Sequence, residues 1–227
     1  MNLLIPAAGM GRRMGSDRNK LLLTLLDKPL LAWTLLAAEG SQAIKWIGIM
    51  GQVTDFPDFK EILASLNLTK PVTLIEGGST RQESVYNGLQ ALADDAQKVL
   101  IHDGARCLAT PELFDRCSEA LNSCNGLIAS IRVKDTIKVV DSQGLILDTP
   151  DRSYLWAAQT PQGFDVKLLK QCHEKGKNLG WEVTDDAALF EKCELDVTIV
   201  QGEETNLKVT TPVDLAIAEF ILHQRLK

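Results

Sequence analysis

Apolar runs alternate with amphipathic stretches along most of the chain, and this alternation predicts the fold. Each run has the length of a buried strand, while apolar residues between the runs recur at helical spacing. Strands and helices in alternation are typical of a mainly parallel sheet flanked by helices. We therefore expect a Rossmann-like α/β fold, with residues 1–227 forming one domain. The expected strands cover residues 2–5, 46–51, 72–75, 98–102, 126–131 and 196–201.

Polar residues and prolines mark the expected starts of the helices. Asp27, with Pro29 in the first turn, predicts a helix that ends near Gly40. Thr211-Pro212-Val213-Asp214 has capping-box spacing with proline at the first helical position, so we expect the last helix to begin there. The other expected helices lie near 58–66, over 81–93 after Ser79 or Thr80, after Thr110-Pro111, near 165–175 and after Thr184.

The alternation stops between Lys134 and Asp151. Residues 136–140 and 145–147 are short apolar or alternating runs on either side of Asp141-Ser-Gln-Gly144, the pattern of a β-hairpin. Because this hairpin lacks the helix expected of regular alternation, we expect residues 134–152 to project from the domain as a β-arm.

Composition narrows the possible partners and the compartment. At 45% apolar and 24% charged residues, the 227-residue chain has the balance of a soluble globular protein. A net charge of −6 without a basic stripe argues against nucleic acid as a partner. No apolar run reaches membrane-spanning length, and Met1 directly precedes the first strand. We expect a cytoplasmic protein that does not bind membranes, with the plastid stroma as the alternative for a processed chain.

Cysteine and histidine spacing predicts neither disulfides nor a structural metal site. The five cysteines are odd in number, no two form C-x-x-C, and the three histidines lack metal-ligand spacing. We expect reduced cysteines that pack in the interior.

The loop after the first strand carries the strongest functional signal. The strand runs into Pro6-Ala-Ala-Gly-Met-Gly-Arg-Arg-Met-Gly15, where most side chains from Ala7 to Gly11 are small or absent. Backbone N–H groups there can approach a ligand closely, and Arg12, Arg13 and Lys20 add positive charge. We therefore expect this loop to bind a nucleoside triphosphate.

Two better-known phosphate loops do not fit this segment. A dinucleotide fingerprint counted from Gly9 has Met14 at its third glycine, and the second strand ends in Gly51-Gln52 rather than in an acid. The P-loop pattern G-x-x-x-x-G-K-[ST] occurs nowhere in the chain. An ordinary glycine turn is the alternative, and the arginine pair within it favours anion binding.

The expected strand ends collect further candidates. Ligands of open parallel sheets bind beyond the carboxyl ends of the strands, and three of the four such loops here combine glycine with arginine. Arg13 and Lys20 are candidates to neutralise the phosphates. Asp103 could reach a magnesium ion or a substrate hydroxyl, or could only cap a turn. Gly78, Arg81 and Ser84 could bind a nucleotide or cap a helix, and Lys208 lies in an expected short strand that could point into the site.

Taken together, these motifs closely resemble the 2-C-methyl-D-erythritol 4-phosphate cytidylyltransferase family of the non-mevalonate isoprenoid pathway. The matching segments span nearly the whole chain in the family's order. They are Pro6-Ala-Ala-Gly-x-Gly-Arg-Arg-Met14, Lys20, Gly78-x-x-Arg81-x-x-Ser84-Val, His102-Asp103-x-Ala-Arg106, Lys134-Asp135-Thr136, Thr160-Pro-Gln162, Thr184-Asp185 and Asn206-x-Lys208-Val-Thr210.

The resemblance implies a nucleotidyltransferase that joins CTP and 2-C-methyl-D-erythritol 4-phosphate, releasing pyrophosphate, with Mg²⁺ as cofactor. It implies a homodimer that exchanges its arms, so that Arg152 reaches the partner's site. It assigns catalysis to Arg13, Lys20, Arg152 and Lys208. It assigns CTP binding to Pro6, Ala7, Ala8, Gly9, Met10, Gly11, Arg12, Gly78, Arg81, Ser84 and Ala105. It assigns binding of the polyol phosphate to Asp103, Arg106, Thr136, Thr160 and Thr184, with Asp103 also the candidate metal ligand.

Two segments depart from the common family pattern, and three rival functions stay open. Asn19-Lys20-Leu21 stands where the family often has Pro-Lys-Gln, and Asp103-Gly-Ala-Arg-Cys107 where it often has Asp-Ala-Ala-Arg-Pro. The rivals are a cytidylyltransferase acting on ribitol 5-phosphate, a catalytically silent nucleotide-binding subunit, and a dinucleotide oxidoreductase.

Overall fold

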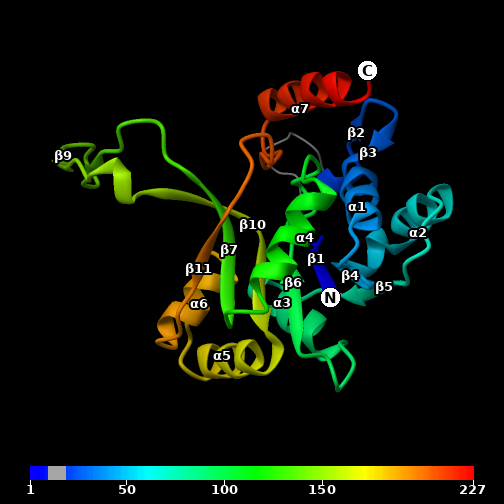
Figure 1. The fold of residues 1–227 in the computed structure, drawn as a ribbon, viewed down its shortest axis with the longest axis horizontal. Helices are drawn as coiled ribbons and strands as arrows, with labels where there is room; N and C mark the ends of the chain where they lie inside the picture. Colours follow the sequence, from blue (N-terminus) through cyan, green and yellow to red (C-terminus); the bar gives the residue numbers. More distant parts are fainter. Residues whose placement is uncertain (10–18) are drawn as a thin grey trace.

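The structure, a computed structural model, describes residues 1–9 and 19–227 (Figure 1). These residues form one seven-stranded sheet with helices on both faces, in the strand order β11-β7-β10-β6-β1-β4-β5. The strands of this sheet are β1 (Asn2–Pro6), β4 (Trp46–Gly51), β5 (Val72–Glu76), β6 (Lys98–Ile101), β7 (Gly126–Arg132), β10 (Trp156–Asp165) and β11 (Thr198–Gln201). The α-helices are α1 (Leu30–Gly40), α2 (Phe56–Ser65), α3 (Arg81–Gln90), α4 (Pro111–Ala120), α5 (Val166–Asn178), α6 (Asp186–Lys192) and α7 (Pro212–Arg225).

The sheet is mainly parallel, as predicted. β1 pairs in parallel with β4 and β6, β4 with β5, and β7 with β11. Only β10, among the described strands of this sheet, runs antiparallel to its neighbours β6 and β7. The predicted α/β fold class is therefore confirmed.

Strand β10 is the largest element that the sequence pattern did not predict. Its sequence, Trp-Ala-Ala-Gln-Thr-Pro-Gln-Gly-Phe-Asp, has neither an apolar run nor clean alternation. Gln159, Thr160 and Gln162 are buried within it because they serve as hydrogen-bonding groups inside the molecule. A register shift between Ala158 and Gln162 interrupts its pairing with β7. Buried hydrogen-bonding side chains therefore replace the apolar residues that usually identify a strand in a sequence.

Two predicted helix caps were wrong. A two-stranded hairpin, β2 (Thr24–Leu25) and β3 (Lys28–Pro29), precedes α1, so Asp27 lies in its turn and does not cap the helix. Asp185, not Thr184, caps α6 by accepting a hydrogen bond from the Ala188 N–H. Of the two candidates for α3, Thr80 is the cap, and α3 ends at Gln90.

Other predicted features have the expected form. Thr211 and Asp214 complete the predicted capping box of α7. Strands β8 (Val139–Val140) and β9 (Ile146–Asp148) pair as the predicted hairpin, which extends away from the sheet at the left of Figure 1. No helix among the described residues is both long and apolar enough to cross a membrane.

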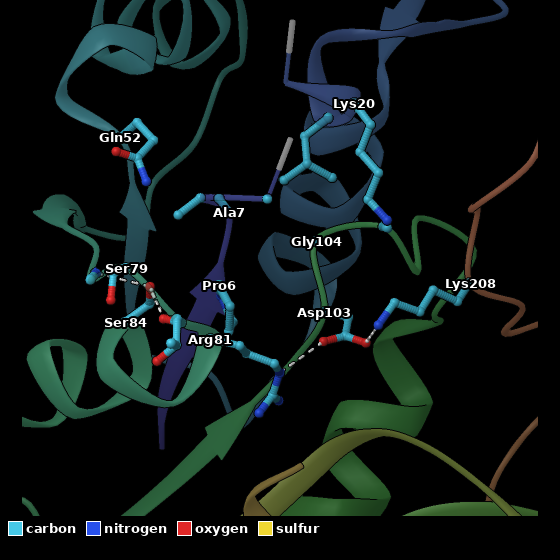
Figure 2. Close-up of a pocket in the computed structure, with 16 residues that line it drawn as sticks. Pro6, Ala7, Lys20, Gln52, Ser79, Arg81, Ser84, Asp103, Gly104 and Lys208 are labelled. Atoms are coloured by element: carbon cyan, nitrogen blue, oxygen red, sulfur yellow. Dashed lines mark hydrogen bonds and ion pairs between the residues drawn. The ribbon is translucent and has the colours of Figure 1, made fainter. Parts of the chain in front are cut away.

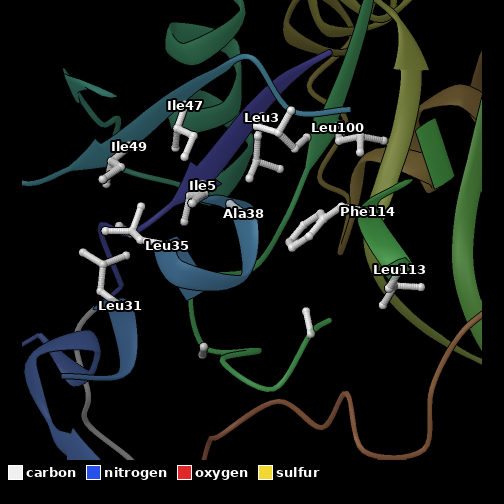
Figure 3. Packing of buried hydrophobic residues seen from close by; sticks show 14 of the residues in the cluster. Leu3, Ile5, Leu31, Leu35, Ala38, Ile47, Ile49, Leu100, Leu113 and Phe114 are labelled. Atoms are coloured by element: carbon white, nitrogen blue, oxygen red, sulfur yellow. The ribbon is translucent and has the colours of Figure 1, made fainter. Parts of the chain in front are cut away.

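Two layers of the core lie one on each face of the sheet, and a third buried cluster packs α7 against α1 and β2. Successive residues of a strand point to opposite faces, so Leu3 and Ile5 pack against α1, α2 and α4, whereas Leu4 packs against α3, α5 and α6. Figure 3 shows the first layer, where Leu35 of α1 and Phe114 of α4 meet the sheet. Both layers are closed by helices, so the strand ends are the positions left for a site.

Candidate active site

A cavity of about 460 Å³ opens at the carboxyl ends of four parallel strands. Most of the residues that line it lie at or after the ends of β1, β4, β5 and β6, which is the location expected for a ligand in an open parallel sheet. Side chains from this cavity are drawn in Figure 2. The lining residues are Pro6, Ala7, Ala8, Gly9, Lys20, Leu21, Gln52, Gly78, Ser79, Thr80, Arg81, Ser84, Asp103, Gly104, Ala105 and Lys208.

The first wall of the cavity is backbone with small side chains. Pro6 ends β1 and residues Ala7 to Gly9 continue beyond it, where the Ala7 N–H donates to the Met50 carbonyl at 2.7 Å. A Cβ added to Gly77 would lie 3.1 Å from the Ala8 Cβ, so the two loops approach closely. A Cβ at Gly9 would meet no atom of the described residues within 4 Å. This wall therefore presents main chain to whatever occupies the cavity.

The second wall is the start of α3. The Gly78 N–H donates to the Ser84 Oγ at 3.0 Å, and that hydroxyl donates to the Thr80 carbonyl at 2.9 Å. Thr80 caps the helix, and Arg81 in its first turn reaches into the cavity with its side chain 29% exposed. Ser84 thus has a structural role in the loop as well as a place in the cavity lining, while nucleotide binding at this motif stays a prediction.

Asp103 lies among three cations. Its carboxylate contacts Lys208 Nζ at 2.7 Å, Arg81 Nε at 3.6 Å and Arg106 Nε at 3.9 Å (Figure 2 shows the first two). Burial alone would raise the pKa of Asp103, but Lys208 and Arg81 outweigh it and lower the pKa to about 2. Asp103 is therefore ionised at neutral pH and holds two cavity-lining cations at fixed positions.

A buried hydrogen-bonded chain holds Asp103 from behind. The Asp103 N–H donates to the Thr160 Oγ1 at 3.0 Å, that hydroxyl lies 3.0 Å from His102 Nδ1, and His102 Nε2 lies 3.2 Å from the Arg106 carbonyl. These partners assign the proton to Nε2, with Nδ1 accepting from the hydroxyl. Burial lowers the pKa of His102 to about 4, which keeps the ring neutral. Thr160 is therefore a support for Asp103 and does not line the cavity.

Arg106 also lies behind the cavity. Its guanidinium donates from Nη1 to the Asn206 carbonyl at 2.8 Å and from Nη2 to the Ala158 carbonyl at 3.3 Å. It thus ties the Asp103 loop to β10 and to the segment before Lys208. Its role in binding substrate stays a prediction, and in this structure its guanidinium is engaged with two main-chain carbonyls.

Lys20 and Lys208 come together from distant parts of the chain. Lys20 Nζ donates to the Val209 carbonyl at 3.2 Å, and the Val209 N–H donates to the Ala105 carbonyl at 2.9 Å. The expectation of a short strand around Lys208 was wrong, since residues 204–210 form no strand. Side-chain contacts fix this segment instead, with Asn206 Nδ2 donating to the Thr160 carbonyl at 2.8 Å.

The two departures from the common family pattern lie against each other. A Cβ added at Gly104 would lie 2.7 Å from Leu21 Cδ1, so Leu21 occupies the space that the glycine leaves open. Asn19 Nδ2 donates to the Ala7 carbonyl at 2.6 Å and to Asp55 Oδ2 at 2.8 Å, which anchors the residue before Lys20 to the first loop. The sequence showed both changes but not their proximity.

Several expected site residues lie away from this cavity. Thr136, Arg152 and Thr184 are exposed and outside its lining, and Arg152 Nη1 donates to the Lys134 carbonyl at 2.7 Å. Met10, Gly11, Arg12 and Arg13 lie outside the described residues. Conversely, Gln52, Ser79 and Thr80 line the cavity, although the sequence analysis did not name them as site residues. All three adjoin strand ends or a helix cap, and that position was the available signal.

The described side chains do not form a metal site. Within residues 1–9 and 19–227, no group of three or more His, Cys, Asp and Glu side chains is placed to hold a metal ion. A divalent cation on Asp103 would compete with Lys208 for the same carboxylate oxygen and would face Arg81 on the other. The chemistry around Asp103 therefore disagrees with its expected role as a metal ligand.

Known proteins resemble this chain over its full length. The family model for 2-C-methyl-D-erythritol 4-phosphate cytidylyltransferase matches residues 1–224. Proteins of that name from Crocosphaera subtropica and Microcystis aeruginosa are 76% and 73% identical over 225 and 226 residues, covering at least 99% of this chain and of each relative.

Solved structures agree with this match. The 4-diphosphocytidyl-2C-methyl-D-erythritol synthase of Anaerococcus prevotii superposes with a TM-score of 0.88 at 32% identity, covering 98% of this chain and 97% of that chain. The 2-C-methyl-D-erythritol 4-phosphate cytidylyltransferase of Thermus thermophilus gives 0.80 at 30% identity, with 98% of both chains covered. The expectation drawn from the motifs is confirmed: the chain belongs to the 2-C-methyl-D-erythritol 4-phosphate cytidylyltransferase family, a class of nucleotidyltransferase.

Proposed function

We propose that this protein transfers the cytidylyl group of CTP to 2-C-methyl-D-erythritol 4-phosphate, giving 4-diphosphocytidyl-2-C-methyl-D-erythritol and pyrophosphate in isoprenoid precursor synthesis. The observation that carries the proposal is the cavity in which the Pro6–Gly9 backbone faces Lys20, Arg81 and Lys208. Main-chain donors and separate cations at strand ends suit two phosphorylated substrates. The family match supplies the identity of those substrates.

The proposed reaction is one in-line displacement. A phosphate oxygen of the polyol phosphate attacks the α-phosphorus of CTP, a new P–O bond forms, and the bond from that phosphorus to the pyrophosphate oxygen breaks. The attacking phosphate is already anionic near neutral pH, so no side chain has to remove a proton. Catalysis then depends on positioning and on charge neutralisation, which we assign to Lys20 and Arg13.

We place CTP along the backbone wall and at the start of α3. Pro6, Ala7, Ala8 and Gly9 would contact the triphosphate side, continuing into Met10, Gly11 and Arg12. Gly78, Arg81, Ser84 and Ala105 would surround the rest of the nucleotide. The support for this division is that these described residues share one continuous cavity lining.

We place the polyol phosphate beside Lys208 and Asp103. Asp103 can accept hydrogen bonds from substrate hydroxyls, and Lys208 can pair with the phosphate. Thr160 and Arg106 support this side from behind the cavity.

Arg152 and Thr136 lie on the arm, and in the proposed homodimer the partner's arm would bring its copies of them to this site. The apolar side chains exposed on the hairpin support such an exchange, since Leu145, Ile146 and Leu147 are 67%, 57% and 63% exposed. The role of Thr184 stays a prediction for the same substrate.

We propose Mg²⁺ as the cofactor, held mainly by phosphate oxygens and water, because the cations around Asp103 leave its carboxylate unsuited to a metal. When bound, Mg²⁺ would neutralise charge on the triphosphate.

We propose the cytoplasm as the compartment, which five unpaired cysteines support.

A substrate-resolved assay tests the proposal. Purified protein is incubated with CTP, Mg²⁺ and either 2-C-methyl-D-erythritol 4-phosphate or ribitol 5-phosphate, and pyrophosphate release is measured. We expect release with the first acceptor and little with the second. Preference for ribitol 5-phosphate would favour the rival cytidylyltransferase, and CTP binding without release from either would favour the silent nucleotide-binding subunit.

A further inference from the structure

A row of three side chains runs from the cavity into the interior between α3, α6 and α5. Arg81 Nη1 donates to Asp186 Oδ2 at 2.7 Å, and the other oxygen, Oδ1, lies 3.5 Å from His173 Nε2. The side chains of Asp186 and His173 are 1% and 2% exposed, whereas Arg81 reaches the cavity. The row therefore connects a cavity-lining cation to a histidine outside the reaction centre.

The carboxylate in the middle is fixed at its backbone. Asp186 is the first residue of α6, and Gln162 of β10 holds that helix start by accepting from the Ala187 N–H at 3.2 Å and donating to Asp185 Oδ2 at 2.8 Å. With its backbone fixed, the Asp186 side chain can still rotate its carboxylate. The orientation of the carboxylate depends on the groups that contact its two oxygens.

Asp186 Oδ1 and His173 Nε2 are both buried without a hydrogen bond, and they face each other. Leaving a charged oxygen and a ring nitrogen unpaired in the interior is unfavourable, and a displacement of a few tenths of an ångström would join them. The ring of His173 is held in place by Tyr86 of α3, with ring centroids 5.8 Å apart. The two atoms are therefore close enough for a small rearrangement to form a hydrogen bond from Nε2–H to Oδ1.

We propose that His173 is a positioning residue for the nucleotide site, acting through Asp186 on Arg81. With Oδ1 engaged by His173, the carboxylate offers Arg81 a single oxygen, and the guanidinium can extend between Asp186 and Asp103 at the cavity wall. Without His173, the carboxylate turns both oxygens to Arg81 and draws the guanidinium inward in a bidentate pair. The inference rests on the proposed nucleotide-binding role of Arg81.

Two amide variants test the donor directly. The amide of His173→Gln can reach the place of Nε2, whereas the shorter amide of His173→Asn cannot, although both residues are polar and neutral. We expect His173→Gln to keep a KM for CTP close to that of the unaltered enzyme. We expect His173→Asn to raise it about 5-fold to 10-fold, as for the net loss of one typical intramolecular hydrogen bond. The KM for 2-C-methyl-D-erythritol 4-phosphate should change little.

A double substitution shows whether the effect passes through Asp186. In an Asp186→Asn background, exchanging His173 for Asn should raise the KM for CTP no further, because the charged oxygen is already gone. Leu169→Ala is the matched packing control, since Leu169 is fully buried in the same helix and makes no polar contact with Asp186. It should lower the unfolding temperature without changing the KM for CTP.

Equal KM values for the Gln and Asn variants, or additive effects of the His173 and Asp186 substitutions, would overturn the inference. Failure of the proposed function gives a different result, because the unaltered enzyme would then form no product from CTP and the polyol phosphate. If Arg81→Ala leaves CTP binding unchanged in calorimetry, the placement of Arg81 is wrong and the inference falls with it.

Discussion

At the candidate site, one carboxylate lies among several positively charged side chains. Asp103 offsets part of the positive charge of Lys208 and Arg81, and its hydrogen-bonded support keeps its carboxylate in place. A row of cations without such an acid would repel one another and spread apart. The arrangement therefore keeps positive groups close enough to act on neighbouring phosphates.

Lys20 is the described residue whose removal we expect to affect chemistry most. Replacing it with Ala removes positive charge near the departing phosphates, so turnover should fall on the order of 10²-fold or more, as for loss of a key electrostatic donor. Steady-state kinetics measures kcat, and calorimetry measures CTP binding separately. Near-normal turnover in the Lys20→Ala enzyme would exclude this role.

His102 predicts a pH dependence of stability. Its pKa is about 4 in the folded protein and 6.5 when exposed, so between these values the unfolded chain binds a proton that the folded protein does not. The free energy of unfolding should therefore fall as the pH drops from 6.5 towards 4, and this contribution should be fully present above 6.5. A His102→Asn variant, which has no titrating group at this position, should lack this pH dependence.

Urea unfolding at several pH values measures this difference. The curves for the unaltered protein and for His102→Asn should converge as the pH falls through that window, since only the former is losing the contribution. Parallel curves would show that His102 is not held neutral by burial.

At the scale of elements, β10 supports the site, and the arm adjoins β10 in the chain. β10 brings Thr160 behind Asp103 and Gln162 to the start of α6, and its antiparallel direction places both between β6 and β7. The arm leaves the sheet between β7 and β10, so its position is coupled to the strand that supports the site. One irregular segment thus joins the cavity to the proposed dimer contact.

Mixed dimers test whether arms are exchanged. We expect Lys20→Ala and Arg152→Ala homodimers to be weakly active, and a heterodimer of the two to regain one working site. In that site, intact Lys20 of one subunit meets intact Arg152 from the arm of the other. The measurement is turnover of co-expressed, differently tagged subunits. No recovery in the heterodimer would place each arm at its own subunit's site.

At the scale of the whole molecule, the apolar arm should determine assembly. Ile146 and Leu147 are mostly exposed in the single chain, so replacing both with Lys should cost little stability. Burying those charges in a dimer would be unfavourable, so we expect a folded monomer with greatly reduced turnover. Sedimentation gives the mass and thermal unfolding gives the stability.

Leu179→Lys is the matched control, because Leu179 is similarly exposed, at 58%, but lies at the end of α5, away from the arm. It should retain the mass and turnover of the unaltered protein. An arm variant that stays dimeric would mean that another surface holds the subunits together.

Local sequence patterns determine many of the secondary-structure elements of this protein and identify its family. Strand runs, the Thr211 capping box and the hairpin depend on residues close in sequence, and the family assignment depends on short motifs. Topology then made the strand-end loops neighbours, since parallel strands end at one edge of the sheet. Pro6–Gly9, Gly78, Arg81 and Asp103 could therefore be expected at one site from sequence, and the family motif added Lys208.

Only the tertiary structure decided what those residues contact. Arg81 and Asp186 are 105 residues apart, Arg106 and Asn206 are 100 apart, and Leu21 closes over the space at Gly104. Such pairings depend on how whole elements pack, because no local pattern records the distance between side chains on different strands and helices. The same reason explains why β10 and the supporting roles of Thr160 and Arg106 could not be predicted. Their polar side chains lie inside because long-range hydrogen bonds satisfy them there.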